Sequence, residues 1–151
     1  MNTQEKIRDI LDSYVLMNLS TVTDDGLPKA RSVDFARDLE DESKLYFMTF
    51  KNSAKVHEMK KNNNVFVVID KDANSMEELS QIRYLRASGK AYQVESSEEM
   101  QKGMGLIMQK YPYLANLPGD PSMMSLFRLE LNEVTVVDNN VSFNHIEKCE
   151  Y

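Results

Sequence analysis

Residues 44–61, with the sequence KLYFMTFKNSAKVHEMKK, form the strand-to-helix junction around which we expect the rest of the chain to fold. The segment Leu45–Phe50 is aromatic and apolar, which is typical of a buried strand. Asn52 and Ser53 are residues that often cap helices, and residues 54–61 can form a helix. A strand therefore runs directly into the N-terminus of a helix.

This junction has the properties of a phosphate site. The free backbone N–H groups and the positive end of the helix dipole both attract an anion. Thr49 adds a hydroxyl at the end of the strand. Lys55 adds a cation in the first helical turn, where the dipole alone disfavours positive charge. A bound anion would remove that conflict, and an ordinary solvated lysine is the alternative interpretation.

The composition narrows the class of protein. The 151 residues predict one domain, 1–151, and 42% of them are hydrophobic, which suffices for a sizeable core. A net charge of −6 argues against a nucleic-acid partner. No apolar run approaches the roughly 20 residues of a membrane span, and the first residues carry no apolar signal segment. The single cysteine, Cys149, permits no intramolecular disulfide, so we expect a cytoplasmic protein with no membrane partner.

The residues before the junction predict a β-hairpin. Val15–Thr23 alternates in the manner of a strand, Asp24–Gly26 makes a turn, and a return strand follows over 29–37. Arg31 shares its face of the return strand with two apolar residues. It is therefore either a desolvated, paired arginine or an edge-strand arginine in water.

The remaining sequence predicts further strands and helices around this hairpin. Sequential hairpins pair in antiparallel fashion, and an antiparallel barrel with helices outside removes exposed strand edges. We therefore predict a mainly β fold with flanking helices. The expected helices are 3–14, 54–62 and 96–110, and the expected later strands are 65–69, 81–94 with a bulge at Gly89, 125–138, and 141–146 after a turn at Asn139–Asn140.

The side chains that usually carry catalysis form no recognisable motif. His57 and His145 are far apart in the sequence and lack the spacing of metal ligands, so we predict no metal site and interpret His57 as a helix-surface residue. No serine has a nucleophile-elbow context, and no glycine-rich nucleotide fingerprint is present. A cofactor that carries the chemistry is the most economical enzyme hypothesis, and no catalytic side chain is predicted.

Four segments in a fixed order carry a resemblance to a known family. They are Pro28–Val33, Leu45–Thr49, Ser53–Val56 and Gly89–Ala91. Together they resemble the FMN-binding split-barrel superfamily, and in particular the short relatives of pyridoxamine 5′-phosphate oxidase, including general stress proteins. The resemblance covers nearly the whole chain. It implies a split antiparallel β-barrel, FMN as cofactor, a homodimer with the flavin at the subunit interface, and an FMN-dependent oxidoreductase with an unknown small-molecule substrate.

The resemblance also implies a set of cofactor-binding residues. They are Arg31, Ser32, Val33, Asp34, Met48, Thr49, Lys55 and Tyr84, the last of which would reach the flavin of the partner subunit. The family often carries an arginine before the lysine, but this chain has Ala54, which removes one phosphate contact. The chain also lacks the arginine- and tryptophan-bearing segment with which the full-length oxidases bind pyridoxal phosphate. We therefore do not expect it to oxidise pyridoxamine phosphate.

A second hypothesis is a non-catalytic flavin or haem carrier, or a sensor, on the same barrel. The absence of an obvious acid, base or nucleophile motivates it. His57 and His145 are the only conventional haem ligands in the sequence. The sequence alone leaves open the choice among FMN, FAD, a deazaflavin and haem.

Overall fold

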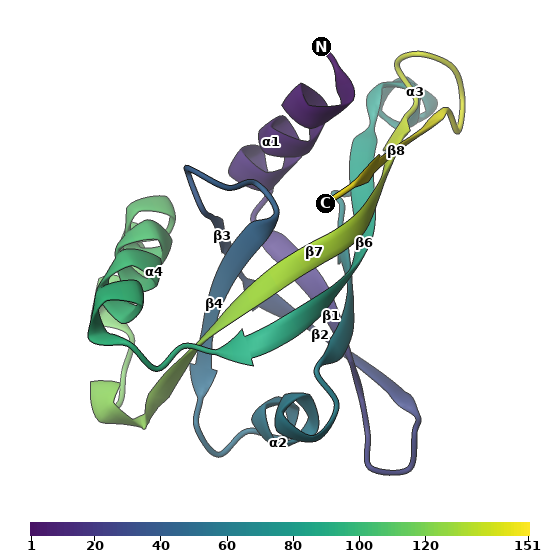
Figure 1. The fold of residues 1–151 in the computed structure, drawn as a ribbon. Coiled ribbons are helices and arrows are strands. Elements are labelled where there is room, and N and C mark those ends of the chain that lie inside the picture. The colour runs from purple at the N-terminus through teal and green to yellow at the C-terminus, as the bar shows by residue number, and fades with distance from the viewer.

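The computed structural model describes residues 1–151, which form an antiparallel β-barrel with helices on its outside (Figure 1). The strands are β1 (Leu16–Val22), β2 (Pro28–Asp34), β3 (Ala36–Arg37), β4 (Lys44–Phe50), β5 (Asn64–Ile69), β6 (Arg83–Gln93), β7 (Met124–Asp138) and β8 (Ile146–Glu150). The helices are α1 (Thr3–Ser13), α2 (Ala54–Lys61), α3 (Met76–Gln81) and α4 (Ser97–Lys110), with the 3₁₀ turns η1 (Pro112–Asn116) and η2 (Pro121–Met123). The predicted mainly β fold is confirmed.

The order of the strands explains why the sheet closes. They lie in the order β2-β1-β5-β6-β7-β4-β3, and β8 adds to the edge of β7 beyond β4. The strands β2 and β3 stand at opposite ends of this order, yet only Phe35 separates them in the chain. The sheet must therefore curl until its ends meet. The edges of β2 and β4 face each other there without pairing, which leaves a split in the barrel wall.

The long ribbon of β6 and β7 crosses the front of the barrel in the view of Figure 1. Its register shifts between Ser88 and Gly89, which leaves Asn132 without a partner. A Cβ atom on Gly89 would lie 2.7 Å from the backbone oxygen of Glu130, a distance that only glycine avoids. The predicted bulge at Gly89 is confirmed, and its cause is this close approach of two backbones.

Both faces of β4 are buried. This packing fixes the position of the C-terminal end of the strand, where Thr49 lies. Leu45 and Phe47 point into the barrel and belong to its main apolar core, and Phe47 stacks on Phe127. Tyr46 lies on the opposite face and belongs to a smaller core against α4 (Figure 1). The helix approaches so closely that a Cβ atom on Gly103 would lie 2.6 Å from Leu126.

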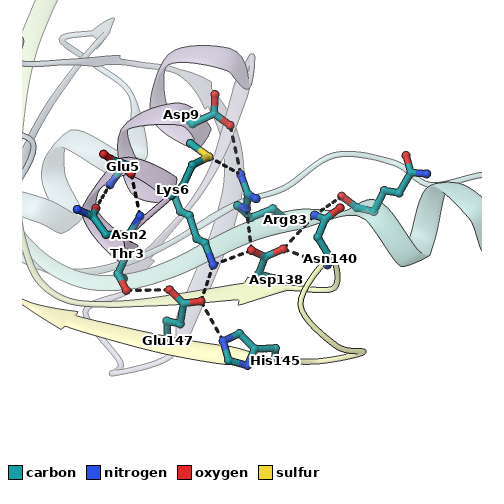
Figure 2. Close-up of polar contacts among 12 residues, drawn as sticks. Asn2, Thr3, Glu5, Lys6, Asp9, Arg83, Asp138, Asn140, His145 and Glu147 are labelled. Carbon is teal, nitrogen blue, oxygen red and sulfur yellow. Dashed lines mark hydrogen bonds and ion pairs between the residues drawn. The ribbon is translucent and has the colours of Figure 1, made fainter.

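A network of ion pairs fixes α1 to the other end of the ribbon (Figure 2). The Nζ atom of Lys6 lies 2.8 Å from Asp138 and 2.5 Å from Glu147, and the Lys6 side chain is only 7% exposed. Arg83 from β6 also pairs with Asp138, at 3.1 Å. The helix is thus held to β6, β7 and β8 at once, and the charges in this network satisfy one another.

Two predicted strands differ from those observed. The strand expected over 29–37 breaks at Phe35, where the Tyr111 hydroxyl lies 3.2 Å from the backbone nitrogen and 2.9 Å from the backbone oxygen and so replaces strand pairing. The return strand expected over 141–146 is wrong, because residues 139–145 form a loop and β8 begins at Ile146. The Asn139 side chain holds this loop by accepting a hydrogen bond from the backbone of Asn144. None of the helices has the length and apolar character that crossing a membrane requires.

Candidate functional site

A cavity of about 250 Å³ lies at the split of the barrel, between β2 and the junction of β4 with α2. Side chains of β2, β4 and α2 form one part of its wall, and α4, η1 and the start of β7 supply an apolar part. Six of the eight predicted cofactor-binding residues line this cavity: Ser32, Val33, Asp34, Met48, Thr49 and Lys55. The structure therefore brings together most of the predicted site.

Lys55 is the cation of this cavity. Its Nζ atom donates a hydrogen bond of 2.7 Å to the Thr49 hydroxyl, and it forms no ion pair with a carboxylate. The Thr49 oxygen lies 3.2 Å from the hydroxyl of Ser53, so the amine and two hydroxyls form one polar group. Burial, reinforced by the nearby guanidinium of Arg31, lowers the pKa of Lys55, and Glu58 only partly opposes this. A second anion at this point would stabilise the charged amine.

The N-terminus of α2 adds uncommitted donors beside Lys55. Ser53 occupies the N-cap position, but its side chain accepts no hydrogen bond from the helix. Side chains do cap the other three helices, at Asn2, Ser75 and Ser96. The first turn of α2 also contains no acidic residue. The backbone donors at this helix end therefore remain available to a ligand or to water.

Arg31 lies beside the cavity and is already paired. Its guanidinium is 2.7 Å from the Thr21 hydroxyl and 3.1 Å from the carboxylate of Glu58, whose side chain is 7% exposed. Burial would raise the pKa of Glu58, but hydrogen bonds from Thr21 and Arg31 outweigh it and lower that pKa. The interpretation of Arg31 as a desolvated, paired arginine is confirmed. Its contact with a cofactor phosphate stays a prediction.

Asp34 is the acid of the cavity. It has no hydrogen bond or ion pair to another side chain, and burial raises its pKa against the opposing charge of Lys110. Lys110 is itself partly buried, with its Nζ atom 2.8 Å from the backbone oxygen of Leu11 and 3.7 Å from the centre of the Phe35 ring. Burial lowers the pKa of Lys110 to about 8. The cavity thus holds one acid and one cation, neither of them neutralised by an ion pair.

Tyr84 lies far from this cavity within its own chain. It pairs with Val137 near one end of β7, whereas Thr49 pairs with Ser125 at the other end. The 15 residues of β7 have a contour length of roughly 50 Å at about 3.3 Å per residue. One chain therefore cannot bring Tyr84 to Thr49. Its assignment to the flavin of a partner subunit stays a prediction.

Two parts of the site differ from what the sequence predicted. Glu58, the partner of Arg31, is buried on the same helix as Val56 and Met59, and an acid between such residues is a signal that it needs a partner. The apolar wall comes from residues far apart in the sequence, and only the abundance of methionine pointed to it. These wall residues are Ile107, Leu114, Leu117 and Met124.

Comparisons with known proteins agree with this architecture. The family model for pyridoxamine 5′-phosphate oxidase matches residues 3–138. The fold is similar to a haem-binding protein from Mycobacterium smegmatis, with a TM-score of 0.81 and 15% identity, over 99% of this chain and 58% of that one. It is also similar to a proposed pyridoxamine 5′-phosphate oxidase from Listeria innocua (TM-score 0.69, 21% identity, 90% and 98% covered) and to the haem storage protein HutZ from Vibrio cholerae (0.70, 16%, 87% and 92%). A search of curated proteins returned no match. At these identities the structural likeness shows the fold alone.

Proposed function

The chain belongs to the pyridoxamine 5′-phosphate oxidase family, and on this premise we propose that it is an FMN-dependent oxidoreductase with a small-molecule substrate. The observation that carries the proposal is the cation at the split of the barrel. Lys55 is partly buried, lacks a carboxylate partner, and lies at the uncapped start of α2. A folded protein that leaves such a charge unneutralised is prepared for an anionic ligand.

The donors around Lys55 suit a phosphate monoester. The ammonium group, the hydroxyls of Thr49 and Ser53 and the backbone N–H groups of the helix start all donate hydrogen bonds, and phosphate oxygens accept them. Charge-assisted hydrogen bonds of this kind contribute roughly 1.5–3 kcal/mol each. The absence of an arginine at Ala54 leaves Lys55 as the cation of the cavity itself.

The rest of the cavity suits the flavin ring. The side of β2 that faces away from β1 pairs with no other strand, so the backbone groups that point outward near Ser32 and Val33 are free to bind the polar edge of a ring. Met48, Leu114 and Leu117 offer an apolar surface that excludes water from the other side. A bound flavin would supply the electron-transfer chemistry, and the protein would need no nucleophile of its own.

A homodimer is part of this proposal. Because Tyr84 lies at the far end of β7 in its own chain, it can contact the flavin only if a second subunit brings it there. Sedimentation analysis with and without FMN measures the oligomeric state. A monomer that binds FMN would contradict the role of Tyr84. The cytoplasmic location, too, stays a prediction.

The experiment that tests the proposal is a titration of FMN and riboflavin, followed by flavin fluorescence. Lys55→Met should weaken FMN binding by roughly tenfold, because about 1.4 kcal/mol corresponds to a factor of ten. Lys51→Met is the matched control, since Lys51 is exposed on the loop before α2. Riboflavin lacks the phosphate, so it should bind weakly and respond to neither variant. Equal FMN binding by the native protein and the Lys55 variant would contradict the phosphate site.

Haem binding is the second candidate function. Two structural neighbours are described as binding or storing haem, and the thioethers of Met48 and Met124 line the cavity. Both histidines are poorly placed to ligate iron there: His57 is 61% exposed and pairs with Asp24, and His145 pairs with Glu147 in the network of Figure 2. The visible spectrum separates the candidates, because haem gives a Soret band and oxidised flavin gives two weaker bands. A Soret band after incubation with haemin, together with no binding of FMN, would favour haem.

A further inference from the structure

A second, apolar pocket adjoins the cavity and is not needed to hold a phosphate. We call it the methionine pocket, because four methionines line it: Met48, Met104, Met108 and Met124. Its other walls come from η1, η2 and the segment between them, at the end of α4. Five residues line both the methionine pocket and the cavity: Met48, Phe50, Leu114, Leu117 and Met124. A molecule in the pocket would therefore lie against the same walls as a cofactor in the cavity.

The chemistry of the walls disfavours anionic ligands. Asp120 is the one charged residue of the methionine pocket, and its carboxylate already accepts a hydrogen bond of 2.9 Å from the backbone of Ser122. That turn lowers the pKa of Asp120, so the carboxylate stays ionised and would repel an anion. No other side chain of the pocket can form an ion pair or a strong hydrogen bond with a ligand. An anionic group placed there would lose its water and find no partner in these walls.

The volume of the pocket and the flexibility of its methionine side chains restrict the possible ligands further. Its volume is about 150 Å³. An apolar cavity of about that volume holds a benzene-sized molecule in a protein core. Methionine sulfur atoms make favourable contacts with aromatic rings, and their flexible side chains adapt to the shape of the ring. A flat ring system is thus better matched than a branched or polar molecule.

We propose that the methionine pocket is the substrate subsite and that it takes a neutral, single-ring aromatic molecule. As a substrate site it rests on the flavin site proposed above, because the shared walls would bring the ligand beside the cofactor. As a binding site it depends only on the lining of the pocket.

Methyl NMR of protein labelled with ¹³C at its methionines tests the binding directly. Benzyl alcohol is the neutral probe, and benzoate is its charged counterpart of similar size. Benzyl alcohol should shift the signals of Met104 and Met108, which line only this pocket. The signals of Met1 and Met76, which are 65% and 72% exposed, should stay in place. Benzoate should shift none of the four.

A pair of variants that each introduce one negative charge provides the matched control. Met108→Glu places a carboxylate in the pocket and should weaken benzyl alcohol binding at least tenfold. Met76→Glu adds the same charge to an exposed position on α3, at the far end of the ribbon, and should leave the binding unchanged. Circular dichroism of both variants checks that they fold. If the two variants bind benzyl alcohol equally well, the proposal is overturned.

Separate FMN titrations distinguish failure of this proposal from failure of the proposed function. If benzyl alcohol shifts the signals of Met104 and Met108 but FMN does not bind, the binding site in the methionine pocket is supported and the proposed flavin function is contradicted. If FMN binds and benzyl alcohol shifts neither signal, only the proposal for the methionine pocket is overturned. Displacement of benzyl alcohol by FMN would assign the pocket to the flavin ring and overturn the proposal. Signals that respond to protein concentration but not to the probe would assign it to a second copy of the chain, with the same consequence.

Discussion

Two lysines at opposite ends of the barrel differ in how far the fold neutralises their charge. Lys6 is almost fully buried between Asp138 and Glu147, and the hydrogen bonds that it donates to these two carboxylates raise its pKa (Figure 2). Lys55 is partly buried without a carboxylate partner, and burial lowers its pKa. The first charge is neutralised by the fold itself. The second has no such partner, and an anion from outside the fold would stabilise it.

We call the Lys6–Asp138–Glu147 network the neutralised end of the barrel. Removing its lysine should reduce the free energy of unfolding more than any other change considered below. Lys6→Met leaves Glu147 without its lysine, and it leaves Asp138, which is 1% exposed, with Arg83 as its remaining cation. Loss of one partner from a buried ion pair typically costs about 3–5 kcal/mol, and we expect about 3–4 kcal/mol in urea unfolding because Arg83 remains. FMN affinity should not change, since the mutation lies at the other end of the ribbon.

Lys60→Met is the control for Lys6→Met, because Lys60 is exposed on α2. It should change the unfolding free energy by less than about 0.5 kcal/mol. A loss below about 1 kcal/mol in Lys6→Met would mean that the network contributes little to folding, and the contrast between the two lysines would fail.

Arg31→Ala should have the next largest effect, because Arg31 lies at the cavity end but is paired. The change leaves the buried carboxylate of Glu58 with Thr21 as its remaining partner. We expect a loss of about 2–3 kcal/mol, less than for a fully buried pair because the Arg31 side chain is 21% exposed. Arg31→Ala combined with Glu58→Gln should recover most of that stability in the same urea unfolding measurement.

The double variant also tests the predicted contact of Arg31 with the phosphate. If Arg31 binds the phosphate directly, the folded double variant should bind FMN roughly 10- to 100-fold more weakly than the native protein. If the only partner of Arg31 is Glu58, the double variant should keep its FMN affinity, and the assignment of Arg31 to the site would be wrong.

Lowering the pH should also destabilise the neutralised end, but by less than the two substitutions do. Burial alone would raise the pKa of Asp138, but hydrogen bonds from Lys6, Asn140 and Arg83 outweigh it and lower that pKa. The pKa of Glu147 is also lowered, mainly by a hydrogen bond from Lys6. Carboxyls with lowered folded pKa values stabilise the fold above their unfolded pKa values, 3.8 and 4.5, and lose this contribution as the pH falls through the folded values.

The acid effect should amount to about 1–2 kcal/mol between pH 6 and pH 3. Urea unfolding at both pH values measures it. The change in unfolding free energy between the two pH values should be smaller in Lys6→Met, which has lost the main partner of both carboxyls. An equal change in the two proteins would assign the acid sensitivity to other groups.

The sequence predicted the cavity end better than the neutralised end for a physical reason. Met48, Thr49 and Lys55 come from one continuous strand and helix, so their proximity follows from local geometry. The hairpin and the barrel closure likewise follow from alternation and turns. The partners of Lys6 lie more than 130 residues away, and nothing in a local pattern specifies which carboxylates a lysine will meet.

The same distinction explains the errors. The end of the chain was predicted to return over 141–146, but asparagine side chains stabilise a longer loop and delay β8. The methionine pocket joins β4, α4 and the turns that follow it, which meet only through tertiary packing. Pro118 and Pro121 are typical of an irregular segment, but such residues do not indicate that the segment lines a pocket.

A crystal structure of the protein with FMN tests the central claim most directly. The account predicts phosphate oxygens within hydrogen-bond distance of the Lys55 Nζ atom and the Thr49 hydroxyl, at the start of α2, with the ring toward the edge of β2. A phosphate bound elsewhere, with the Lys55 amine still donating to Thr49 alone, would contradict it.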